Sequence, residues 1–130
     1  MSKSKRQNES PNFWDVKAIL DWLVDSSSQQ TLWDRHGTEF GWKTKSDLLN
    51  SRVQLDPTEC EIGVNCFELI PCDMIGNGRG EETNLVVALR DKDGVAGRGQ
   101  MPSGGNSDGQ YATKLQIATI VDWIDAGCPD

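Results

Sequence analysis

The chain has 130 residues, with 20 acidic and 13 basic side chains and a formal net charge of −7. This balance disfavours nucleic acid or an anionic membrane as a partner, because proteins that bind either one present a basic face. Hydrophobic residues make up 36% of the chain and charged residues 25%, as in a typical globular domain, and no apolar run approaches the roughly 20 residues of a membrane span.

The first ten residues are polar and carry the basic side chains Lys3, Lys5 and Arg6. We expect residues 1–10 to be a disordered basic tail and residues 11–130 to form one domain. No apolar segment of the kind found in secretory signals follows the basic residues, so a cytoplasmic location is expected.

The first predicted helix spans about residues 12–25. Ser10 and Pro11 are typical of a helix start, and the Ser/Gln run at 26–30 is expected to end the helix. Between them, apolar residues recur at the spacing of one helical face: Val16, Ile19, Leu20, Leu23 and Val24.

The middle of the chain is less regular. Residues 31–44 are predicted to be irregular and aromatic, and residues 46–51 to form a short helix. Residues 52–80 are rich in Gly, Pro, Asp and Asn, so we interpret them as ordered loop rather than sheet. The glycine-rich stretch at 76–80 precedes a helix and offers an anion site there, although such glycines more often only turn the chain.

Two further helices are predicted, at 81–91 and 111–126, with a glycine-rich loop between them. Gly127 and Pro129 are typical of a helix end. The first and last helices are expected to pack together, with Val16, Ile19, Leu20 and Leu23 buried against Ile117, Ile120, Val121 and Ile124. The resulting fold class is mainly α, with three main helices joined by long loops.

The C-terminal third resembles the end of c-type cytochrome domains. The matching segments are GQMPSGG at 99–105 and IVDWIDAGCP at 120–129. In that family a Met-Pro loop supplies an axial methionine to haem iron, and an apolar helix follows. Thr83-x-Leu85 and Val16-x-x-Ile19-Leu20 are similar to other parts of such domains, above all those of large multidomain bacterial proteins. The resemblance implies a cytochrome c-like fold.

The haem-attachment motif Cys-x-x-Cys-His of that family is absent. In one alignment its positions fall at Val24, Ser27 and Ser28, and in another at Leu32, Arg35 and His36. The second alignment keeps the single histidine of the chain and places Met101 as the other axial residue. Both alignments lack the two thioether cysteines, so a degenerate motif is expected.

Two functions follow from the resemblance. The first is a haem-free domain that acts as a protein-binding or accessory module and has another protein as its partner. Its empty haem space would be filled by aromatic side chains, for which Trp33, Phe40 and Trp42 are the candidates. The alternative is an electron-transfer protein that binds haem non-covalently through His36 and Met101. No catalytic residues are predicted, since no nucleophile–base pair is evident.

The four cysteines support a third hypothesis, a cysteine-based redox accessory. None of them forms Cys-x-x-Cys, and their spacing matches no common zinc pattern, so no metal site is expected. Free buried thiols and a disulfide pair both remain open for them. The candidate thiols are Cys60, Cys66, Cys72 and Cys128.

Overall fold

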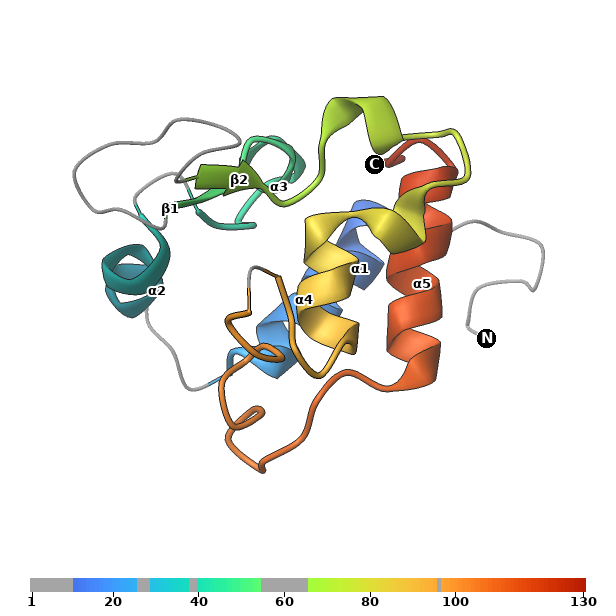
Figure 1. Ribbon diagram of the computed structural model, residues 1–130. Coiled ribbons are helices and arrows are strands. Elements are labelled where there is room, and N and C mark those ends of the chain that lie inside the picture. Colours follow the sequence, from blue (N-terminus) through green and yellow to red (C-terminus); the bar gives the residue numbers. More distant parts are fainter. Residues whose placement is uncertain (1–10, 26–28, 38–39, 55–65, 96) are drawn as a thin grey trace.

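The computed structural model describes residues 11–25, 29–37, 40–54, 66–95 and 97–130 (Figure 1). The predicted tail at residues 1–10 lies outside the described residues. Two short 3-10 helices, η1 (Cys72–Met74) and η2 (Gly80–Glu82), precede the fourth α-helix. The α-helices and strands are α1 (Phe13–Leu23), α2 (Gln29–His36), α3 (Lys45–Leu49), β1 (Arg52–Gln54), β2 (Cys66–Glu68), α4 (Asn84–Arg90) and α5 (Lys114–Asp125).

The first helix begins at Phe13 with Asn12 as its N-cap, whereas Ser10, part of the predicted helix start, lies outside the described residues. The Asn12 side chain accepts a hydrogen bond from the Asp15 backbone N–H (3.0 Å), and the Asp15 carboxylate accepts one from the Asn12 N–H (2.9 Å). This reciprocal pair satisfies two N–H groups that would otherwise lack partners at the helix start. The helix then buries one face, formed by Phe13, Val16, Leu20 and Leu23.

The predicted packing of the first and last helices is confirmed, but Ile19, Ile117 and Val121, which were predicted to be buried, are only partly buried. Helix α5 lies against α1, and its residues Ile120, Trp123 and Ile124 are buried in the same core as those of α1 (Figure 1). The Phe13 N–H donates to the Pro129 carbonyl at 3.1 Å, so the start of α1 meets the chain that follows α5. The start of α1 therefore lies next to the end of α5.

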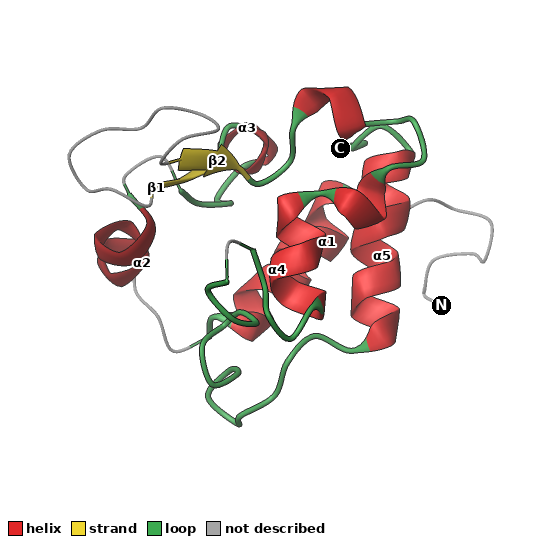
Figure 2. Ribbon diagram, in the orientation of Figure 1, coloured by secondary structure: helices red, strands yellow, loops and turns green. Residues whose placement is uncertain are grey.

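Helix α4 completes this helical core (Figure 2). Thr83, which is fully buried, caps α4 by accepting a hydrogen bond from the Val86 N–H. The adjacent Gly80 donates its N–H to the Asp125 carboxylate at 2.8 Å. The end of the 76–80 stretch thus binds a carboxylate of the protein itself, and the packing against α5 leaves no room there for a Cβ.

The predicted fold class is wrong. The described residues form five α-helices and a two-stranded sheet, instead of three main helices of a cytochrome c-like fold joined by loops. Residues 29–36, assigned partly to a helix end and partly to irregular structure, form α2. Within 52–80, interpreted as loop, β1 pairs antiparallel with β2, with Val53 opposite Phe67.

Local chemistry explains these differences. The Thr44 hydroxyl accepts from the Asp47 N–H, and the Asp47 carboxylate accepts from the Thr44 N–H, so α3 has its own capping pair. The two strands have only three residues each, which is too short for an alternating pattern to stand out. They are joined to the core by the Leu85 N–H, which donates to the Leu69 carbonyl at 2.9 Å.

Among the described residues, no helix is both long enough and apolar enough to span a bilayer.

Candidate functional site

A pocket of about 400 Å³ lies between the helical core and the small sheet. This volume falls within the range of small-molecule sites. Its walls come from α1, α2, both strands, α4 and the loop before α5. The apolar lining residues include Leu20, Leu23, Leu32, Val53, Phe67, Leu69, Leu85, Leu89 and Val95.

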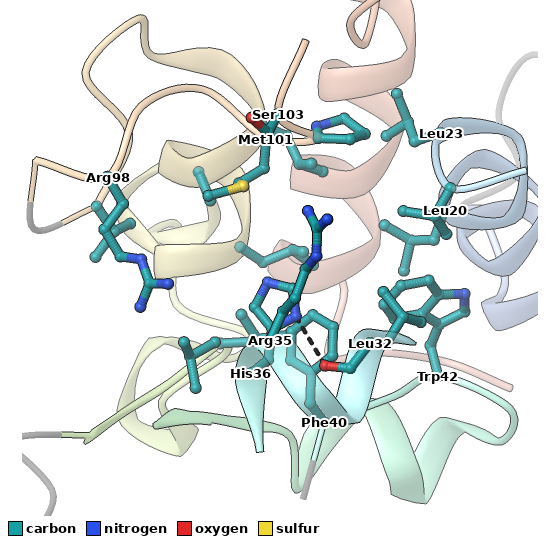
Figure 3. Close-up of a pocket in the computed structure, with 18 of the residues that line it drawn as sticks. Leu20, Leu23, Leu32, Arg35, His36, Phe40, Trp42, Arg98, Met101 and Ser103 are labelled. Atoms are coloured by element: carbon teal, nitrogen blue, oxygen red, sulfur yellow. Dashed lines mark hydrogen bonds between the residues drawn. The ribbon is translucent and has the colours of Figure 1, made fainter. Parts of the chain in front are cut away.

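His36 lies in this pocket wall, at the end of α2 (Figure 3). Its Nδ1 is 3.0 Å from the carbonyl oxygen of Leu32, one turn earlier in the helix. A carbonyl oxygen can only accept, so Nδ1 carries the hydrogen. In the neutral ring the lone pair is then on Nε2, which leaves that nitrogen able to ligate a metal.

Burial lowers the pKa of His36 below its ordinary value of 6.5, and the positive charges of Arg98 and Arg35 lower it further. The hydrogen bond to Leu32 opposes the shift without cancelling it. The imidazole is therefore neutral at pH 7. Its ring also stacks on Phe40, with the centroids 4.2 Å apart and the planes 16° from parallel, so Phe40 covers one face.

Met101 reaches the same pocket from the loop that follows α4. Its N–H donates to the Ala88 carbonyl at 2.8 Å, and the neighbouring Gln100 side chain donates to the Leu89 carbonyl at 2.9 Å. The loop itself turns tightly at Gly94, where a Cβ would lie 2.1 Å from the Gly99 carbonyl oxygen. In Figure 3, His36 on α2 and Met101 on the loop approach the pocket from opposite sides.

The three aromatic residues predicted to fill the haem space leave the pocket open. Phe40 and Trp42 form part of its wall, whereas Trp33 is not among the lining residues. The Trp33 indole N–H donates to the Phe40 carbonyl (3.2 Å), and that of Trp42 donates to the Asp21 carboxylate (3.0 Å). Side chains must fill an enclosed void, but this pocket is partly open to solvent and need not be filled.

The alignment that placed the degenerate motif at Leu32, Arg35 and His36 brings three pocket residues together on α2. The other alignment places two of its positions, Ser27 and Ser28, outside the described residues. Sequence reasoning missed the arginines at the site, Arg35 and Arg98. The available signal was their position, Arg35 beside His36 and Arg98 three residues before Met101.

None of the candidate thiols in the described part of the chain lines the pocket. Cys60 lies outside the described residues, and Cys66 is disulfide-bonded. Cys72 is exposed and Cys128 is buried, both as free thiols. Burial raises the pKa of Cys128 to about 11, so this thiol stays protonated and is a poor nucleophile at pH 7. A redox role for Cys128 is therefore disfavoured.

No protein-family profile, curated protein or solved structure matches this chain. The resemblance of the Met-Pro loop and last helix to c-type cytochrome domains therefore stays an expectation from the sequence.

Proposed function

We propose that the pocket binds haem non-covalently, that His36 Nε2 and Met101 Sδ would ligate its iron, and that the protein transfers electrons. The observation that supports this proposal is that the imidazole and the thioether line one apolar pocket from opposite sides. Histidine with methionine is an established axial pair of electron-transfer haem.

The pocket residues fit such a cofactor in three respects. The walls are mainly aliphatic and aromatic, as a porphyrin face requires. The hydrogen bond from Nδ1 to Leu32 fixes the tautomer that leaves Nε2 as the donor. The lowered pKa of His36 keeps the ring neutral, so a proton does not compete for that nitrogen at pH 7.

Haem iron, when bound, supplies one-electron chemistry. The chain contributes an apolar lining and the orientation of the two side chains. The hydrogen bonds to the Ala88 and Leu89 carbonyls hold the Met101 loop before any ligand arrives. Phe40 covers one face of the His36 ring and limits its rotation. Preformed side chains lose less conformational entropy on binding, which favours affinity.

The test is a haemin titration of the purified protein, followed by visible absorption. We expect a Soret band shifted from that of free haemin and a low-spin spectrum. His36→Ala should weaken binding by more than the roughly tenfold that the loss of an outer-shell partner costs. Met101→Leu should keep haemin bound but remove the near-infrared signature of a thioether on ferric iron.

Met74→Leu is the matched control, because Met74 lies in η1 and is not among the pocket-lining residues. It should leave the spectrum unchanged. A spectrum identical to that of free haemin, or one that neither His36→Ala nor Met101→Leu alters, would reject haem ligation. The haem-free protein-binding or accessory module would then be the better hypothesis.

A further inference from the structure

The charged side chains that line the pocket are positive, whereas the net charge of the chain is negative. The protein carries a net charge of −7, yet no acidic residue is among those that line the pocket in the described part of the chain. The permanently charged side chains there are Arg35 and Arg98, both cationic. A ligand in this pocket would therefore contact apolar side chains and lie close to two positively charged guanidinium groups.

Arg35 and Arg98 also differ from Arg79 and Arg90, because they form no ion pair with an acidic residue in the described part of the chain. Arg79 forms an ion pair with Glu82 at 3.4 Å, and Arg90 forms one with Asp91 at 2.7 Å. Within the described residues, neither Arg35 nor Arg98 has an ion pair or a side-chain hydrogen bond. Their guanidinium donors are thus available to a ligand.

The two arginines come from different elements. Arg35 is on α2, one residue before His36, and Arg98 is in the loop that leads to Met101 (Figure 3). Both positive charges act on the His36 imidazole, so both lie within electrostatic reach of the same ring. An anionic group placed between the ring and either guanidinium would therefore be attracted from both elements.

We propose that Arg35 and Arg98 bind carboxylate groups of the ligand, so that the pocket selects a molecule with an apolar body and acidic side chains. Guanidinium groups match carboxylates in geometry and form charge-assisted hydrogen bonds with them. The inference rests on the proposed function, since the two propionates of haem are such groups. According to this inference, the carboxylates of the ligand, and not only its iron, determine the affinity of the pocket for it.

The test uses protoporphyrin IX, which has both carboxylates but no iron, and compares it with its dimethyl ester. Binding is followed by quenching of tryptophan fluorescence, because Trp42 lines the pocket. We expect the diacid to bind about tenfold more tightly than the diester. Arg35→Gln and Arg98→Gln should each weaken diacid binding about fivefold, the effect of a partly exposed ion pair of roughly 1 kcal/mol.

Arg79→Gln removes the same charge away from the pocket and should change the affinity for the diacid less than twofold. Both exposed arginines can be replaced without disturbing the core, and circular dichroism checks this. Equal binding of diacid and diester, no binding of the diacid, or an equal loss with Arg79→Gln would overturn the inference. Because protoporphyrin IX has no iron, these outcomes are independent of ligation by His36 and Met101.

Discussion

At the residue scale, His36 is positioned by the end of a helix. Gly37 adopts φ +97°, a left-handed conformation that glycine takes without strain, and its N–H donates to the Trp33 carbonyl at 2.8 Å. A Cβ at Gly37 would also lie 2.3 Å from Oε1 of Gln54 on β1. The glycine thus ends α2 directly after His36 and allows the imidazole to lie beside the sheet.

The lowered pKa of His36 makes stability depend on pH. Below about pH 6.5 the unfolded chain takes up a proton on His36 before the folded protein does, so the free energy of unfolding falls. The stability that the neutral His36 ring contributes is fully present above pH 6.5. It is lost as the pH falls toward the pKa of His36 in the folded protein. Urea unfolding at pH 7.5 and at pH values below 6.5 should show this loss.

His36→Asn is the control for this titration, because an amide donor can still reach the Leu32 carbonyl but cannot titrate. We expect the variant to lose less stability than the wild type between the same two pH values. Equal losses in the two proteins would mean that groups other than His36 cause the dependence.

At the element scale, the sequence predicted the helices that have a strong apolar stripe. The expected helix at 111–126 corresponds to α5 at Lys114–Asp125, and the expected 12–25 to α1 at Phe13–Leu23. Helix α2 was missed because its sequence, QQTLWDRH, is mostly polar and has no apolar stripe. Its end signal, a glycine directly after a histidine, lies within residues 31–44, for which the sequence predicts irregular structure.

The residues of the site could be predicted only where a sequence motif marks them. His36 and Met101 were singled out because the motif resemblance pairs them, and the structure places both in one pocket. Arg35 stands beside His36 and Arg98 three residues before Met101, but no motif marks either arginine as a ligand-binding residue. Arg35 on α2 and Arg98 in the loop after α4 reach the same pocket only because the chain folds. Their common location is therefore a property of tertiary structure.

Helix α5 offers a matched pair of substitutions that tests its packing. Ile120 is fully buried in the core, whereas Leu115, on the same helix, is 77% exposed. Ile120→Ala should lower the free energy of unfolding by about 2–5 kcal/mol, because it removes packed atoms and leaves a cavity. Leu115→Ala should change it by no more than about 0.5 kcal/mol. Equal effects in denaturant unfolding would contradict the burial of Ile120 against α1.

At the scale of the whole molecule, the core and the pocket share side chains. Leu20 and Leu23 of α1 and Leu85 and Leu89 of α4 are buried in the core, and all four also line the pocket. The two strands and α2 form the other side of the pocket, across from the helical core (Figures 1 and 3). A ligand in this pocket would therefore contact both parts of the molecule, and these contacts exist only when the chain is folded.

This shared wall predicts that haemin stabilises the protein globally. A ligand that binds only the folded state, at 100 times its dissociation constant, should raise the free energy of unfolding by about 2.7 kcal/mol. Urea unfolding with and without haemin measures the shift. Met74→Leu should retain it, and His36→Ala should lose much of it, since weaker binding lowers the ratio of haemin to its dissociation constant. A shift of equal size in His36→Ala would instead indicate that haemin binds elsewhere on the folded chain, and the absence of a shift in the wild type would indicate that the pocket does not bind it.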